Sequence, residues 1–134
     1  MLMHYVRMGL IRHLERDLGA TGCDVNFSQF RVLKALAHSD GMNATELARR
    51  VEHDAGALTR MLDRLQEKGY VIRRPCEGDR RAVDVTLTEA GRVLWSSMNR
   101  VASELNAYAV SDLTEEEQKT LTGFLQRIRA TVER

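Results

Sequence analysis

The chain has 134 residues, of which 43% are hydrophobic and 29% charged, and 20 basic against 19 acidic residues leave a net charge of +1. A domain of this size buries enough apolar surface to fold without disulfides or metals, so the composition excludes a disordered chain, a collagen and a simple coiled coil. The near-neutral charge lacks the basic excess of many nucleic-acid-binding proteins and, taken alone, favours an ordinary soluble protein.

Neither a membrane anchor nor a metal framework is visible. No apolar run approaches the roughly 20 residues of a spanning helix, and residues 1–7 lack the apolar block of a signal peptide. We therefore expect a cytoplasmic protein that does not enter a membrane. Cys23 and Cys76 lie far apart without a CxxC spacing, and the four histidines are dispersed, so we expect no disulfide framework, metal site or cofactor.

The first two predicted elements are helices. Apolar residues at positions 3, 6, 10, 14 and 18 trace one face of an amphipathic helix, which ends in the run 19–22. The second helix is predicted to begin with Ser28 as its N-cap, with Phe27 and Val32 placed as a hydrophobic staple. The run 39–41 (Ser-Asp-Gly) ends it.

Two more helices follow in close succession. Residues 43–46 (Asn-Ala-Thr-Glu) have the form of a capping box, which predicts a short helix, and Ala48 is small enough to let that helix approach its neighbour. Asp54 caps the next helix, which Gly69 ends. Apolar residues at 58, 61, 62 and 65 must face the core, so the outward face carries Gly56, Thr59, Arg60, Asp63, Arg64 and Glu67.

A hairpin and two helices complete the chain. The runs 70–74 and 82–87 read as strands joined by a turn at 75–79, with Val83, Val85 and Leu87 on one face. Thr88 caps a long helix with inward residues at 94, 98, 101 and 105. Residues 114–117 (Thr-Glu-Glu-Glu) form a capping box for the last helix, with inward residues at 121, 124, 125, 128 and 132.

This order of elements predicts a mainly α domain with a small β-hairpin wing, the winged helix-turn-helix. In that arrangement the second helix of the motif lies in the DNA major groove, and the hairpin reaches the neighbouring backbone or minor groove. The same fold also serves modules that dock proteins and never read DNA. Both readings stay open at this point.

The residues of the fourth helix and the hairpin resemble one family. The runs 54–70 (DAGALTRMLDRLQEKGY) and 79–91 (DRRAVDVTLTEAG) are similar to the MarR family of transcriptional regulators. The most specific part is the Asp-x-Arg of the wing, Asp79 and Arg81, followed by an alternating strand that ends in Leu87 and Thr88, and then by Gly91.

The resemblance implies a homodimer and one MarR-type domain over 1–134. The N-terminal helix (1–18) and the C-terminal helices (89–134) would interleave as the dimer interface, and residues 28–88 would form the winged DNA-binding region. Apolar stripes at both chain ends, with little domain left to bury them, agree with a two-fold contact. The alternative is that these helices pack on the winged region of the same chain.

The outward face of the fourth helix supplies the candidate contacts to double-stranded DNA. Thr59, Arg60 and Arg64 would reach base edges or phosphates, and Gly56 and Ala57 permit close approach. Asp63 and Glu67 would restrain the arginines by pairing along the helix. Thr45, at a helix start, offers its hydroxyl and nearby amides to a phosphate.

The wing supplies a second set of contacts. By resemblance, Arg81 enters the minor groove, and Asp79 supports it through a salt bridge. Arg73, Arg74 and Arg80 are candidate phosphate contacts. Losing the specific contact of Arg81 would weaken operator binding by roughly tenfold.

The controlling signal is less legible. Family members commonly bind small aromatic or phenolic compounds in a crevice between the dimer helices and the winged region, which implies a small-molecule effector. A redox-responsive regulator is the alternative. Cys76 lies among wing arginines that would favour its thiolate, whereas Cys23 precedes the second helix, unlike the cysteine of peroxide-sensing members. Catalysis is not expected, because nothing brings Cys76, His53 and Asp54 within hydrogen-bond reach.

The sequence therefore predicts a homodimeric DNA-binding regulator, a repressor of a pseudo-palindromic operator that a ligand releases. The charge distribution is consistent with this function. Residues 49–81 hold nine basic and six acidic residues, whereas residues 89–134 hold six and seven. We therefore expect affinity to depend on a few placed arginines, and non-specific binding to be weak.

Overall fold

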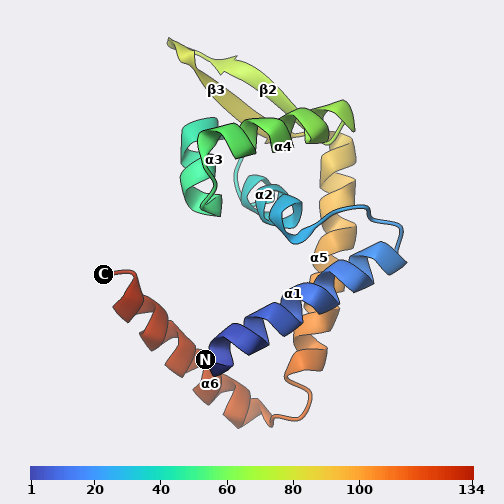
Figure 1. Ribbon diagram of the computed structural model, residues 1–134, viewed down its shortest axis with the longest axis vertical. Coiled ribbons are helices and arrows are strands. Elements are labelled where there is room, and N and C mark those ends of the chain that lie inside the picture. The colour runs from blue at the N-terminus through green and yellow to red at the C-terminus, as the bar shows by residue number, and fades with distance from the viewer.

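The computed structural model describes residues 1–78 and 82–134, and it describes residues 79–81 only as part of a strand. Six helices and a small antiparallel sheet make up the fold (Figure 1). In chain order the elements are α1 (Leu2–Ala20), α2 (Phe27–Ala37), β1 (Met42–Asn43), α3 (Ala44–Val51), α4 (Ala55–Glu67), β2 (Val71–Cys76), β3 (Asp79–Leu87), α5 (Glu89–Ala109) and α6 (Glu115–Val132). Among the described residues no helix is long and apolar enough to cross a membrane.

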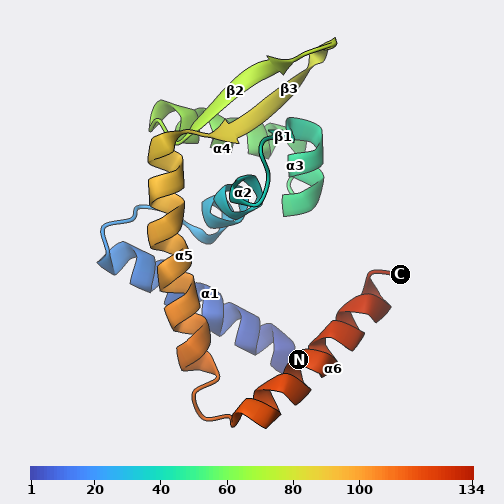
Figure 2. The ribbon, with the colours of Figure 1, turned by 180° about the vertical axis from the view of Figure 1, so that it is seen from behind.

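The middle of the chain forms a winged helix-turn-helix, as predicted. Helices α2, α3 and α4 surround one apolar core, and the β2–β3 hairpin projects beyond α4 (Figure 1). The sheet order is β1-β3-β2, and β1 lies beside β3 on the side away from β2 (Figure 2). Leu33, Leu47, Leu62 and Val85 are buried at the centre of this core.

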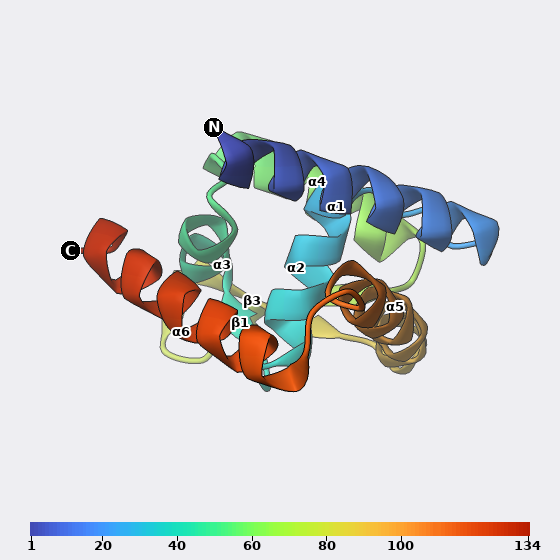
Figure 3. The ribbon, with the colours of Figure 1, turned by 90° about the horizontal axis from the view of Figure 1, so that it is seen from below.

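Helix α5 connects the winged region to the outer helices. Its Thr88 N-cap accepts a hydrogen bond from the backbone N–H of Gly91, and Met98, Val101 and Leu105 are buried, as the sequence predicts. Viewed from below, α1 and α6 project from the α5 end of the molecule as two separate arms (Figure 3). Helix α1 packs on α5 and α2, and Leu14 and Leu18 are its buried residues.

The outer helices expose most of their predicted apolar faces. Helix α6 begins with the predicted capping box of Thr114 and Glu117, yet it buries no residue within the chain. The prediction that its apolar stripe faces inward is therefore wrong for one chain. The exposed large apolar residues of these two helices, with the N-cap of α1, are Met1, Leu2, Met3, Tyr5, Val6, Leu121, Phe124, Leu125, Ile128 and Val132.

The beginning of α2 differs from the prediction. Asn26 is the N-cap, and it forms a capping box with Gln29, so Ser28 lies inside the helix and the staple of Phe27 and Val32 is not formed. Asn26 competes successfully because the Gln29 side chain returns a hydrogen bond to its backbone N–H. The Glu15 carboxylate of α1 also accepts from the Phe27 N–H at 2.9 Å, which ties α1 to this helix start.

The hairpin is longer than predicted, and the sheet has a third strand. The first strand extends to Cys76 and the second begins at Asp79, while the two-residue β1, with Met42 opposite Val85, was not predicted. Such a short strand carries no periodicity from which to infer it. Val83 is exposed, in contrast to the predicted inward face of 83, 85 and 87, because the hairpin tip extends past the core.

Candidate nucleic-acid interface

Helix α4 is fixed by one face and presents the other to solvent. Leu58, Leu62 and Leu65 are buried in the core, and the Asp54 carboxylate accepts the Ala57 N–H at 2.7 Å. This cap satisfies a helix-end amide and sets the first turn. The exposed side is therefore held in place by core packing, and it carries four of the predicted contact residues, Gly56, Thr59, Arg60 and Arg64.

The two arginines of α4 are available to an external partner. Among the described residues no salt bridge involves Arg60 or Arg64. A Cβ atom added to Gly56 would lie 3.3 Å from the Asp54 carboxylate and 3.5 Å from Arg60 Nη1, so the Arg60 guanidinium lies over this glycine at ordinary contact distance. The Thr59 hydroxyl donates to the Ala55 carbonyl at 2.8 Å and presents its oxygen as an acceptor.

Two predicted contacts at helix starts are only partly available. The Thr45 N–H donates to the Asn43 side chain at 2.8 Å, which leaves its exposed hydroxyl for a phosphate. Asn43 caps α3 through this bond alone, and the full capping box with Glu46 is not present. Ala57 is half-buried, and its N–H is held by Asp54, so its role is limited to its small size.

The Arg73 side chain bonds to α4 of the same chain, whereas a phosphate contact would require it to face outward. Its Nη2 lies 2.6 Å from the Asp63 carboxylate, and its Nε donates to the Gln66 side-chain oxygen at 2.8 Å. The predicted i,i+3 pairing of Asp63 with Arg60 is therefore replaced by a contact across to the wing. The sequence offered no signal for it, because the partners lie in different elements and no periodicity joins a helix to a strand.

Of the other candidate residues in the wing, the structure describes the side chain of Arg74 but not those of residues 79–81. Arg74 is exposed on β2 and stays a candidate phosphate contact. Asp79, Arg80 and Arg81, the support and the predicted minor-groove residues, lie outside the residues whose side chains are described.

The redox role that the sequence suggests for the cysteines stays a prediction, and one described contact of Cys76 opposes it. The Cys76 thiol donates to the Asp84 carboxylate at 2.9 Å, and a carboxylate beside the sulfur does not stabilise a thiolate. The neighbouring Arg73 guanidinium is directed to α4. Cys23 is half-buried and packs against the core. The described residues contain no group of three or more metal-ligating side chains.

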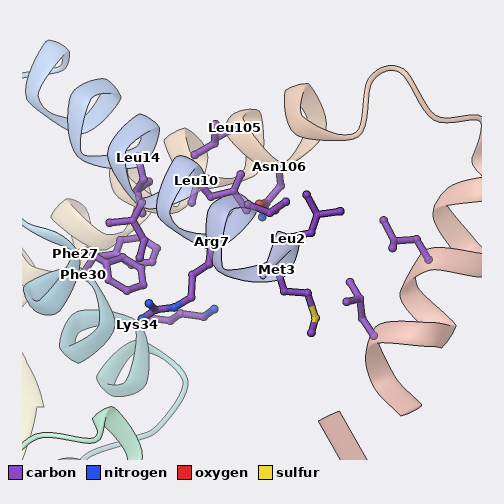
Figure 4. Close-up of a pocket in the computed structure, with 15 residues that line it drawn as sticks. Leu2, Met3, Arg7, Leu10, Leu14, Phe27, Phe30, Lys34, Leu105 and Asn106 are labelled. Atoms are coloured by element: carbon purple, nitrogen blue, oxygen red, sulfur yellow. The ribbon is translucent and has the colours of Figure 1, made fainter. Parts of the chain in front are cut away.

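A pocket that the sequence did not single out lies between the outer helices and the winged region. It has a volume of about 610 Å³, and apolar side chains of α1, α2, α5 and α6 line it. Phe27 and Phe30 form one wall, and Arg7 and Lys34 lie side by side at its edge (Figure 4). An apolar cavity with two cations at one side suits a molecule with an apolar body and an anionic group.

The comparisons with known proteins agree on one family. The MarR family profile matches residues 25–83. Multiple antibiotic resistance protein MarR of Escherichia coli K12 is 34% identical over 128 residues, which cover 95% of this chain and 88% of that protein. HTH-type transcriptional regulator SarZ of Staphylococcus haemolyticus is 30% identical over 105 residues, or 78% of this chain and 70% of that one.

The fold leads to the same proteins. The crystal structure of wild-type MarR from E. coli in its apo form superposes with a TM-score of 0.83, covering 95% of this chain and 93% of that chain. A cysteine-to-serine variant of E. coli MarR in complex with operator DNA also has a TM-score of 0.83, at 34% identity and with coverage of 95% and 90%. The chain therefore belongs to the MarR family of winged helix-turn-helix transcriptional regulators.

Proposed function

We propose that this protein is a cytoplasmic homodimeric repressor that binds a pseudo-palindromic DNA site and releases it when a small amphipathic anion binds. The observation that carries the DNA-binding role is the exposed face of α4. Arg60 and Arg64 lie on a helix whose opposite face is buried in the core. The backbone that carries these two side chains is therefore held in place. A bidentate arginine discriminates guanine from the other bases by about 1–3 kcal/mol.

The dimer is supported by the apolar faces of α1 and α6. Helix α6 has no buried residue, and Phe124, Leu125 and Ile128 are exposed on it. Contiguous apolar surface of this extent is uncommon on a monomer and typical of an interface. A two-fold dimer would place two copies of α4 about one helical turn of DNA apart, which explains the preference for a palindrome.

The effector proposal rests on the pocket beside α1 and α2. Its walls are apolar and aromatic, and Arg7 and Lys34 supply positive charge at one edge. We therefore propose an aromatic carboxylate or phenolate as the ligand class. A ligand there touches both the outer helices and the winged region, so its binding would shift the spacing of the two recognition helices and release DNA.

DNA selection tests the regulator. Duplexes bound from a random pool should converge on one palindrome, and affinity for it should fall steeply with salt as phosphate counterions are released. Arg60→Ala and Arg64→Ala should each weaken binding about tenfold, as expected for losing a base contact. Arg12→Ala, an exposed arginine on α1 far from α4, is the matched control and should bind as the wild type does.

A protein-docking module would give a different result. Absent or salt-insensitive DNA binding would contradict the regulator and favour the docking module. A separate experiment tests the effector. An aromatic carboxylate should release the selected duplex, while its uncharged amide should not. Arg7→Ala with Lys34→Ala should abolish the release, and equal action of acid and amide would contradict the anionic ligand class.

A further inference from the structure

The two elements that reach toward DNA are held in different ways. Helix α4 is packed in the core through three leucines, whereas the described buried residues of the hairpin, Val71, Val85 and Leu87, all lie near its base. Beyond that base, Arg74, Pro75, Glu77 and Gly78 are exposed. The hairpin runs alongside α4 in both side views (Figure 1, Figure 2). Its angle to α4 therefore depends on contacts between the two elements.

Among the described residues, Arg73 makes the side-chain hydrogen bonds that join the hairpin to α4. Its guanidinium leaves β2 opposite Val85 and reaches two acceptors one helical turn apart on α4, the Asp63 carboxylate at 2.6 Å and the Gln66 amide oxygen at 2.8 Å. A planar guanidinium that donates to two acceptors fixes its orientation as well as its distance from them. The ammonium of a lysine would fix the distance only. The Arg73 side chain is 26% exposed and that of Asp63 57%, so the contact is shielded from solvent on the arginine side only.

The same contact affects which charged side chains on the exposed face of α4 are paired. Asp63 lies between Arg60 and Arg64 on α4, close enough along the helix to pair with Arg60. Because Arg73 holds the Asp63 carboxylate, no salt bridge among the described residues draws on Arg60 or Arg64.

We propose that Arg73 is a positioning residue for DNA reading: through Asp63 and Gln66 it sets the angle of the wing to α4 and leaves Arg60 and Arg64 available to DNA, without contacting DNA itself. This inference rests on the proposed DNA-binding function. It replaces the phosphate contact that the sequence suggests for Arg73, and it assigns Asp63 a role as the partner of Arg73.

The salt dependence of binding separates positioning from phosphate contact. The probe is a labelled duplex selected on the wild-type protein. Arg73→Gln should lower affinity about tenfold at every salt concentration and leave the slope of log affinity against log salt unchanged. Arg74→Gln, its exposed neighbour, should reduce that slope by about 0.9, the value for one lost phosphate contact. A slope reduced by the same amount in Arg73→Gln, or an unchanged affinity, overturns the proposal.

Two further variants test how Arg73 acts. Arg73→Lys keeps the charge but loses the fork, so its affinity should stay near that of Arg73→Gln; full recovery would identify a simple charge contact. Asp63→Asn in the Arg73→Gln background should weaken binding no further than Arg73→Gln does, because the two side chains act as one unit. Additive losses would show that they act separately.

A measurement without DNA keeps this inference distinct from the proposed function. Nitroxide labels at Glu67→Cys on α4 and Glu77→Cys on the wing, in a chain carrying Cys23→Ser and Cys76→Ser, report the distance between the two elements. Arg73→Gln should broaden the distance distribution, and Arg74→Gln should not. An unchanged distribution overturns the positioning role even if the wild type binds DNA, whereas a wild type that binds no duplex contradicts only the proposed function.

Discussion

Residues 27–88 and the outer helices α1 and α6 carry similar apolar stripes, but they differ in what covers them. In the winged region the stripes meet one another, and Leu33, Leu47 and Leu62 are buried within the chain. In α6 no residue of the stripe is buried by the described part of the chain, and in α1 only the C-terminal half is covered. The difference shows that helical periodicity reveals which face is apolar, but not which molecule packs against it.

The contrast has a consequence for stability. The winged region has a core of its own, so its free energy of unfolding should depend little on protein concentration. The outer helices gain their burial only on association, so their contribution should rise with concentration. Substitutions of one chemical type, placed in both regions, can therefore separate folding from assembly.

The largest effect is expected from Leu33→Ala in α2. Its side chain is fully buried, and its truncation should lower the free energy of unfolding by about 2–5 kcal/mol through lost burial and a residual cavity. Urea unfolding followed by the fluorescence of Trp95, which packs on Phe30 at 5.5 Å between ring centroids, measures this.

Leu125→Ala is the matched control in α6, where the side chain is 48% exposed. It should leave the unfolding of dilute monomer unchanged and weaken the dimer instead. If it destabilised the monomer as much as Leu33→Ala does, α6 would be covered by its own chain, and the contrast between the two regions would fail.

Ile128→Glu addresses the interface directly. A charge placed in an apolar contact loses hydration without gaining a partner, so the dimer should weaken by roughly 100-fold. Sedimentation velocity over a concentration series measures the change. Ala130→Glu introduces the same residue on the opposite side of α6 and should dimerise as the wild type does. Equal dimerisation of both variants would exclude this face as the interface.

Gly91→Ala tests the junction between the two regions. A Cβ at this position would overlap the Tyr70 carbonyl oxygen, and a backbone atom cannot move aside at low cost. The first turn of α5 must then shift away from Tyr70, the residue that precedes β2, which should destabilise the fold by about 1–3 kcal/mol. Gly123→Ala in α6, with nothing within 4 Å, should be neutral or slightly stabilising in the same urea assay.

The sequence predicts the helix ends well because most caps form hydrogen bonds with residues close to them in the chain. Asp54, Thr88 and Thr114 were recognised as caps because each bonds to an amide three residues on. The sequence does not distinguish Asn26 from Ser28 as the cap, since these polar residues lie two positions apart and both fit; the returning bond from Gln29 selects Asn26.

The candidate site was less predictable because its contacts cross between elements. The exposure of Arg60 and Arg64 follows from helical period alone. The partner of Arg73 depends instead on how the hairpin lies against α4, which no spacing encodes. The pocket edge formed by Arg7 and Lys34 likewise requires α1 to lie near α2, and residues so far apart in the chain give no sequence signal for it.

The smallest predicted effect concerns the turn between α3 and α4. The sequence has no glycine there, and Glu52 adopts a left-handed conformation with φ of 56° to end α3. Glu52→Gly should therefore stabilise the protein by about 0.5–1 kcal/mol, since glycine enters this region without steric cost. The 3.8 Å ion pair with Arg31 that it removes contributes little, because Glu52 is 82% exposed.

Glu46→Gly removes a similar 3.8 Å pair with Arg50 but lies within α3, where glycine should destabilise by about 1 kcal/mol. Opposite signs for these two Glu→Gly substitutions in urea unfolding would identify backbone conformation as the cause, whereas equal losses would show that the ion pairs dominate and that the left-handed turn carries no strain.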